Sequence, residues 1–191
     1  MSASTAIGDV TQTLQDLLTS QQNPADLFDV SLNSPAEETL DPNTTRPKVN
    51  LFLFRVTENP FIQNQDWIPD GLSNLEFPPL AVNLFYVLTP FAENKLDEHR
   101  VLGEAMRIFH DNGVVQAPNL RGSLENTAEE IKIDLVQLAV EDLTRIWTAL
   151  AKPYRLSVGY EVRTVMVDSS VARPVGRATS IVTQFTQTGG A

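Results

Sequence analysis

The sequence PYRLSVGYEVRTVMVDS, from Pro153 to Ser169, carries the most regular two-residue alternation in the chain. Apolar side chains take every second position, and small or polar side chains take the positions between them. This is the pattern of a strand with one face on a core. One face holds Leu156, Val158, Tyr160, Val162 and Met166, and the other holds Ser157, Gly159, Glu161 and Arg163. We predict a strand of roughly 12 to 14 residues that begins after Pro153 and crosses the whole domain.

Helices and further strands are predicted on the N-terminal side of this strand. Apolar side chains at three- and four-residue spacings predict helices over residues 5–20, 94–111 and 143–150. Shorter apolar or alternating runs predict strands over residues 27–32, 49–56, 80–88 and 131–135. The order of these elements predicts an α+β fold, with a mixed and mostly antiparallel sheet flanked by about three helices.

The run from Val49 to Val56 is apolar on both faces of the predicted strand. An edge strand usually turns polar side chains to water on one face, so this pattern predicts a central strand. A strand that is apolar on both faces needs a layer packed on each of them. Either a helix of the same chain or a neighbouring subunit could supply the second layer, and the pattern does not distinguish them.

Two aromatic residues flank an irregular segment that precedes the strand at residue 80. Pro69-Asp70-Gly71 within this segment predicts a turn. Trp67 and Phe77 are interpreted as anchors that hold the segment on the core, in preference to a ligand site, because large aromatic side chains usually bury apolar area. Asn112-Gly113 predicts the end of the helix over 94–111, with glycine in the left-handed turn.

The alternation of apolar and polar residues ends after Asp168. We therefore predict that the compact domain covers residues 1–169. Residues 170–191 are predicted to form an extended arm that begins with a linker over Arg173 to Arg177. Within it, Ile181, Val182 and Phe185 give one short segment with β propensity. Such a segment either folds back on its own sheet or adds a strand to the sheet of a neighbouring subunit. The sequence leaves both open.

Composition restricts the classes of partner. The chain has 191 residues, a formal net charge of −10 and no cysteine. Excess negative charge repels a phosphate backbone, so nucleic-acid binding is disfavoured. Residues 1–20 lack the basic start and apolar stretch of a secretion signal. The longest apolar block, residues 80–91, is shorter than the roughly 20 residues of a membrane span. We therefore expect a soluble protein made in the cytoplasm, with no direct membrane insertion.

No catalytic or cofactor motif is recognisable in the sequence. There is no cysteine nucleophile, no G-x-S-x-G elbow and no glycine-rich phosphate loop. The two histidines, His99 and His110, lie on one predicted helix about three turns apart, without a carboxylate pair to complete a metal set. They are interpreted as solvent-facing side chains. The sequence predicts no enzyme activity and no cofactor.

The stretch from Ile146 to Ser169, an IWTAL run followed by the long strand, resembles a signature of one protein family. This is the tail-terminator or cap family of extracellular contractile injection systems, which are phage-tail-like particles. The resemblance covers most of residues 5–169 in order. It includes the helix over Ile7 to Leu18, Asn50 to Phe54 with Glu58-Asn59, Pro79 to Val82 with Tyr86 to Thr89, and Leu102 to Met106 with Phe109-His110.

The resemblance implies a fold like that of phage tail terminators and a structural role. Members are expected to form a six-membered ring on the baseplate-distal end of the particle, where the ring binds the last discs of inner tube and contractile sheath. On this interpretation Ile181, Val182 and Phe185 add a strand to a neighbouring cap or sheath subunit. The alternative is an adaptor, such as a tube-sheath connector, elsewhere in the same particle.

Overall fold

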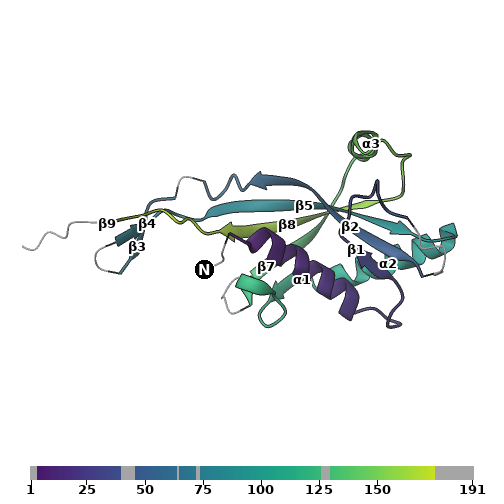
Figure 1. Ribbon diagram of the computed structural model, residues 1–191, viewed down its shortest axis with the longest axis horizontal. Coiled ribbons are helices and arrows are strands. Elements are labelled where there is room, and N and C mark those ends of the chain that lie inside the picture. Colours follow the sequence, from purple (N-terminus) through teal and green to yellow (C-terminus); the bar gives the residue numbers. More distant parts are fainter. Residues whose placement is uncertain (1–3, 40–45, 64, 72–73, 126–129, 175–191) are drawn as a thin grey trace, which may run out of the picture.

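The computed structural model describes residues 4–39, 46–63, 65–71, 74–125 and 130–174 (Figure 1). Its helices are α1 (Ala6–Ser20), α2 (Lys95–Asp111) and α3 (Val140–Ala149), with one 3-10 turn, η1 (Gly122–Leu124). Its strands are β1 (Asp29–Ser31), β2 (Lys48–Glu58), β3 (Ile68–Asp70), β4 (Asn74–Glu76), β5 (Leu80–Phe91), β6 (Val114–Gln116), β7 (Glu130–Val136), β8 (Val158–Val167) and β9 (Ala172–Pro174).

The main sheet has six strands in the order β1-β2-β5-β8-β7-β6. Every neighbouring pair is antiparallel except β1 and β2, which are parallel. Strand β5 is paired along most of its length with β2 on one side and β8 on the other. The predicted α+β fold, with a mixed and mostly antiparallel sheet and three helices, is therefore confirmed.

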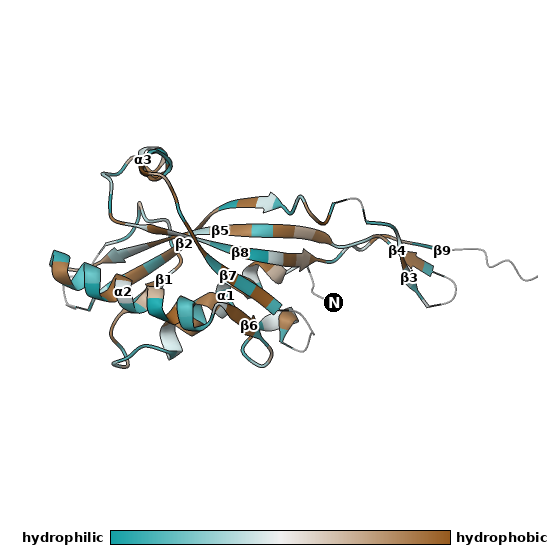
Figure 2. Cartoon of the chain, turned by 180° about the vertical axis from the view of Figure 1, so that it is seen from behind, coloured by the Kyte–Doolittle hydropathy of each residue, from teal (hydrophilic) through white to brown (hydrophobic). Residues whose placement is uncertain are grey.

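The core lies between the main sheet and the helices α1 and α2. Both helices lie on one side of the sheet, and α3 lies on the other (Figures 1 and 2). Each helix turns its apolar stripe inward, so that Val10 and Leu14 of α1 and Ile108 of α2 are fully buried. From the sheet, Tyr86 is fully buried, and its hydroxyl lies 2.8 Å from the hydroxyl of Thr11. Burial raises the pKa of Tyr86 to about 12, so the phenol stays protonated at neutral pH.

A bulge in β8 corrects the predicted face of one side chain. Val162 pairs with Leu84 and Val165 pairs with Val82, so β8 has one more residue than β5 between these pairs. Thr164 takes up the extra residue with a φ of 59°. Val165 consequently lies in the core with Val162. Met166 pairs with Ala81 and lies outside the core cluster, so its predicted place on the core face is wrong. The strand has 10 residues rather than the predicted 12 to 14.

Strand β2 is central over its first three residues only. Lys48 to Asn50 pair with β1, while the remainder pairs with β5 on one side. Within the described part of the chain, no strand pairs with the outer edge of Leu51–Glu58. The register against β5 shifts between Leu53 and Arg55, which marks a second bulge at Phe54. Of the predicted central strand over Val49 to Val56, only Val49 and Asn50 are paired on both sides, so the prediction is wrong from residue 51 onward.

A second, three-stranded sheet projects from one end of the molecule (Figure 1). Strands β3 and β4 form a hairpin at the predicted turn, where Gly71 has a φ of +68°. Strand β9 pairs with β4, so Arg173 and Pro174, predicted in a linker, belong to a strand. Trp67 and Phe77 stack edge to face, 5.3 Å between ring centroids, and the Arg173 guanidinium lies 4.1 Å from the Trp67 centroid. These rings bind the small sheet together. The prediction that they anchor this segment to the core is therefore wrong.

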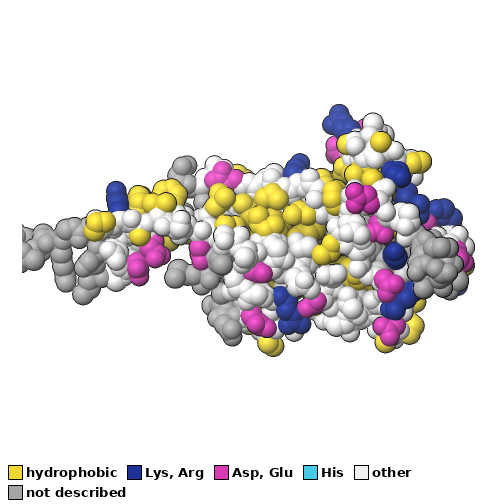
Figure 3. Space-filling view, in the orientation of Figure 1, with side chains coloured by type: hydrophobic (Ala, Val, Ile, Leu, Met, Phe, Trp, Pro, Cys, Tyr) yellow, Lys and Arg dark blue, Asp and Glu magenta, His cyan; other side chains and the backbone are white. Residues whose placement is uncertain are grey.

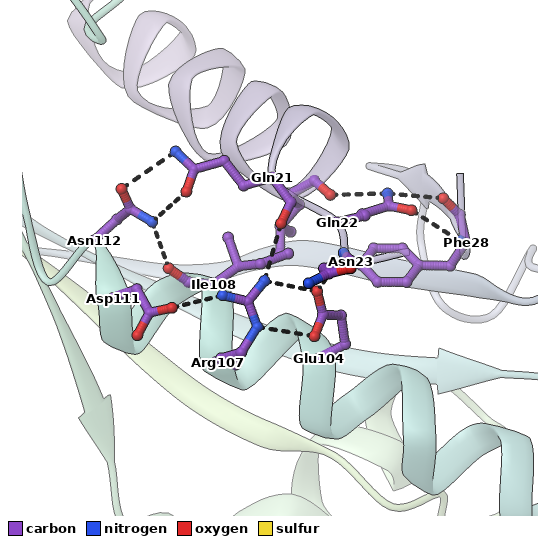
Figure 4. Close-up of polar contacts among 10 residues, drawn as sticks. Gln21, Gln22, Asn23, Phe28, Glu104, Arg107, Ile108, Asp111 and Asn112 are labelled. Carbon is purple, nitrogen blue, oxygen red and sulfur yellow. Dashed lines mark hydrogen bonds and ion pairs between the residues drawn. The ribbon is translucent and has the colours of Figure 1, made fainter. Parts of the chain in front are cut away.

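Polar contacts fasten the end of α1 to α2 (Figure 4). The Arg107 guanidinium donates to Glu104, to Asp111 and to the carbonyl of Gln21. The side chain of Asn112 donates to Gln21 Oε1 and to the Ile108 carbonyl, and so ends α2. Gly113 is not among the residues with positive φ, so the predicted left-handed glycine turn is wrong. The polar side chain of Asn112 takes its place.

Three hydrogen-bonded carboxylates on α1 and α2, those of Asp9, Asp16 and Glu104, predict a loss of stability in acid. The Arg107 hydrogen bond lowers the pKa of Glu104, and that from Arg121 lowers the pKa of Asp16. At Asp9, burial alone would raise the pKa, but hydrogen bonds from Ser123 and Thr5 outweigh it and lower the pKa. Because the pKa is lower in the folded chain, the unfolded chain takes up a proton at a higher pH than the folded chain does. Each carboxylate therefore stabilises the fold above its ordinary pKa, and this contribution is lost as pH falls through the folded pKa.

We therefore expect the free energy of unfolding to be flat above pH 4.5, the ordinary value for Glu104, and to fall below it. Urea denaturation at half-unit steps from pH 6 to pH 3 measures this dependence. The Glu104→Gln variant should show a shallower fall than the parent chain. The matched control is Asp66→Asn, at an exposed carboxylate without an ion pair among the described residues. If both variants kept the parent slope, the contribution of Glu104 would be contradicted.

Candidate interaction surfaces

The sheet face opposite α1 and α2 carries an aromatic patch, formed by Phe52 and Phe54 of β2 and Phe85 of β5. All three side chains are partly exposed. The rings of Phe54 and Phe85 are 6.4 Å apart, and the Arg55 guanidinium lies 4.0 Å from the Phe85 centroid. The bulge places Arg55 here, because the register shift pairs it with Phe85. Apolar side chains beneath one arginine are the composition typical of the energetic centre of a protein-protein interface.

A polar row runs across the same face beside the aromatic patch. Asn83 Nδ2 donates to Glu161 Oε1 at 2.9 Å. Arg163 donates to Asp134 Oδ2 at 2.6 and 3.0 Å, and its Nε lies 3.9 Å from Glu161. The charged groups of this row are partnered within the chain, whereas Asn83 Oδ1 is buried without a hydrogen-bond partner among the described residues, so the row is a structured polar border. A partner covering this face would meet apolar surface over β2 and β5, and fixed charges over β8 and β7.

The projecting small sheet forms a second candidate surface. Several apolar side chains are exposed here or near its base, namely Phe61, Ile68, Phe77, Leu80 and Val171. A hollow of about 430 Å³ lies where the small sheet leaves the main one, lined among others by Pro78, Leu80 and Val167. Apolar side chains gather on this projection in the space-filling view, with charged side chains beside them (Figure 3). Exposed apolar groups at the tip of an elongated molecule favour contact with another protein.

A second hollow, of about 550 Å³, lies on the helix side between α2 and β7. Its lining includes Met106, Phe109, Leu135 and Tyr160. Phe109 and Tyr160 stack edge to face with centroids 4.9 Å apart and are buried, so their contact belongs to the core. Leu135 remains 58% exposed at the rim. The hollow is predominantly apolar, and its lining also includes Arg107, His110 and Asp134.

The described residues contain no group of three or more His, Cys, Asp or Glu side chains placed to hold a metal ion. His99 and His110 are both exposed on α2, as the sequence predicts. The buried carboxylate, Glu98, is engaged by Lys95 and Arg155 and so joins α2 to the segment before β8. Across the same described ranges, none of the helices combines the length and apolar character that a membrane crossing requires.

The predicted binding residues Ile181, Val182 and Phe185 lie outside the described residues. The structure places the start of the predicted arm, because Ala172–Pro174 pairs with β4 of the same chain. The sequence predicts that a helix or a neighbouring subunit covers the second face of the strand over Val49 to Val56, but it does not single out the aromatic patch on that face. The signal of the patch was present in the run over Val49 to Val56, whose apolar second face is the one that carries Phe52 and Phe54.

Comparison with known proteins assigns the family. The model of the Pvc16 N-terminal domain matches residues 9–180, nearly the whole chain. The chain belongs to the Pvc16 N-terminal domain family. No protein of curated function matches the sequence.

Two solved structures share the fold of this Pvc16 N-terminal domain. One is the PVC sheath/tube terminator of an extracellular contractile injection system in its extended state, with a TM-score of 0.69 and 18% identity over 96% of this chain. The other is the tube-terminating cap of the anti-feeding prophage, with a TM-score of 0.66 and 17% identity over 93% of this chain. The matches span 64% and 61% of those two chains, so each relative contains additional sequence.

Proposed function

We propose that this Pvc16 N-terminal domain protein is a structural cap of a contractile injection particle. It would end the inner tube and the contractile sheath at the baseplate-distal end, and so fix the length and stability of the particle. Family membership over residues 9–180 carries the proposal, and the fold shared with a sheath/tube terminator supports it. A cap needs broad contact surfaces and no catalysis, in keeping with the aromatic patch and the partnered charges of the described residues.

The proposed partners are further copies of the chain, in a homohexameric ring, together with inner-tube and sheath subunits. The net charge of −10 argues against nucleic acid as a partner. We place the protein in the cytoplasm of the producing cell, as part of a particle that is then released or anchored, without direct membrane insertion. The chain is divided into a tail-terminator-like domain, residues 1–169, and a C-terminal arm, residues 170–191.

Within this proposal, Ile181, Val182 and Phe185 of the arm bind a neighbouring subunit by strand addition. The register of β9 supports an outward course of the chain. Ala172 lies opposite Glu76, near the main sheet, and Pro174 lies opposite Asn74, farther out on the projection. The chain therefore leaves the described structure at the outer end of the small sheet, where a neighbour is within reach.

Deletion of this protein from its producing gene cluster tests the function. The expected result is loss of uniform particle length by electron microscopy, with overgrown, sheathless or unstable tubes, because nothing then stops tube and sheath growth. Re-expression of the parent chain should restore a narrow length distribution. Particles of normal length with an intact distal end would contradict the cap. In that case, labelled protein at the baseplate end would identify an adaptor instead.

A further inference from the structure

The outer edge of β2 is the longest open strand edge of the described main sheet. Its residues 51–58 present backbone groups for which no described segment provides hydrogen bonds. Strand β1 leaves the edge after Asn50, whose side chain donates to the Asn33 carbonyl at 2.8 Å. Natural edge strands are usually protected by lysine, proline or a covering segment. Between residues 51 and 58 there is no lysine and no proline.

Both faces beside this edge offer apolar surface. On the face opposite α1 and α2 lie the partly exposed rings of Phe52 and Phe54. On the helix side, Val56 is 42% exposed and Leu53 is partly buried. An added strand would therefore need apolar side chains on both of its faces, at alternate positions.

Residues 178–187 of the arm, ATSIVTQFTQ, have that composition. In an extended conformation Ile181 and Phe185 fall on one face, and Val182 falls on the other. The segment contains neither proline nor a charged residue. It matches the two-sided surface of the β2 edge better than a strand that is apolar on one face only.

The position of Pro174 decides which copy supplies the strand. The β2 edge lies alongside residues 82–88 of β5, whereas Pro174 lies opposite Asn74. Eight residues of extended chain separate 74 from 82, roughly 26 Å, while the four residues from Pro174 to Ala178 reach roughly 14 Å. In its own copy the arm would have to turn back from the outward course of β9, and only its last residues, from about Val182 on, would reach the edge. A neighbouring copy can receive the whole segment from Ala178, which favours it as the acceptor.

We propose that residues 178–187 of one copy add a strand to the outer edge of β2 in a second copy. The inference rests on the proposed ring for its setting and assigns the contact that joins its members. The donor and the acceptor are different surfaces of the same chain, so each copy gives one strand and receives one. A head-to-tail contact of this kind closes into a ring when the rotation per subunit is a whole fraction of a turn.

Disulfide trapping tests the contact, since the parent chain has no cysteine. Full-length Val56→Cys with one tag is co-expressed with full-length chains, carrying a second tag, that have a single cysteine at each position from 180 to 185. After mild oxidation, mixed-tag dimers are expected at alternate arm positions, at least tenfold above background, because strand side chains alternate. The matched control acceptor is Arg145→Cys on α3, 83% exposed, which should give only background.

Each outcome decides between the contact and the proposed function. Trapping is measured on purified particles and on the isolated chain. No mixed-tag dimer above background, or the same yield from Arg145→Cys, would overturn the inference. Particles of normal length that contain the protein but give no mixed dimer would overturn it and leave the cap intact. Mixed dimers of the isolated chain, with no effect of gene deletion, would support the contact and remove the cap.

Discussion

Leu84→Ala is expected to lower the free energy of unfolding by about 2–5 kcal/mol. Leu84 is fully buried in the central strand β5, where it pairs with Val56 on one side and Val162 on the other. Truncation removes apolar contacts and leaves a cavity that paired strands on both sides cannot close. Domains of this size are usually stable by about 5–15 kcal/mol, so this is a large fraction of the total. The change is measured as a shift of the urea midpoint by circular dichroism.

Leu80→Ala is the matched control, because it makes the same substitution on the same strand. Leu80 is 50% exposed, so its truncation should cost about 1 kcal/mol or less. Equal losses at Leu80 and Leu84 would contradict the placement of the core along β5. A change in the denaturant slope would instead indicate that the variant alters compactness, and the comparison would then rest on the thermal midpoint.

Most of the main sheet could be predicted because its elements carry local patterns. The stripe of Val10 and Leu14 predicts α1, and the alternation of Tyr160 and Val162 predicts β8. These patterns depend on side chains a few residues apart, which the sequence shows directly. The family resemblance then supplied the architecture that local patterns leave open.

The parts that could not be predicted depend on pairing between distant segments. The bulge at Thr164 reverses the faces of β8, and only its register against β5 reveals it. The edge of β2 is exposed because β1 pairs with only three of its residues. The sequence of β2 does not reveal how long its neighbouring strand is. Strand β9 is three residues long and contains Pro174, so its strand character comes from its pairing with β4.

What covers the second face of β2 could not be predicted, for a related physical reason. The apolar second face of β2 predicted a covering layer, and a helix of the same chain was one of the two possibilities. Helix α3 lies on that side of the sheet, but Phe52, Phe54 and Phe85 remain partly exposed. The other possibility, a neighbouring subunit, is the one that the exposure favours.

Phe85→Ala is accordingly expected to weaken attachment of the protein to particles about 30-fold. Aromatic side chains at the centre of an interface typically contribute about 2 kcal/mol or more to binding, which corresponds to this factor. Phe85 contacts both the Phe54 ring and the Arg55 guanidinium, so its loss removes the middle of the patch. The measurement adds purified variant to particles from the deletion strain and determines the concentration that half-saturates their distal ends.

An interface role for Phe85 requires that Phe85→Ala still folds, whereas a core role predicts that it unfolds. Phe85 is only partly buried, so its truncation should cost less stability than Leu84→Ala, and unfolding of the isolated variant checks this. Tyr154→Ala is the matched control, since it removes an aromatic ring that is 51% exposed in the segment before β8 and is not part of the patch. Folded Phe85→Ala that saturates particles at the parent concentration would show that this face is not covered, and the partners would then have to bind the edge of β2 or the projecting small sheet.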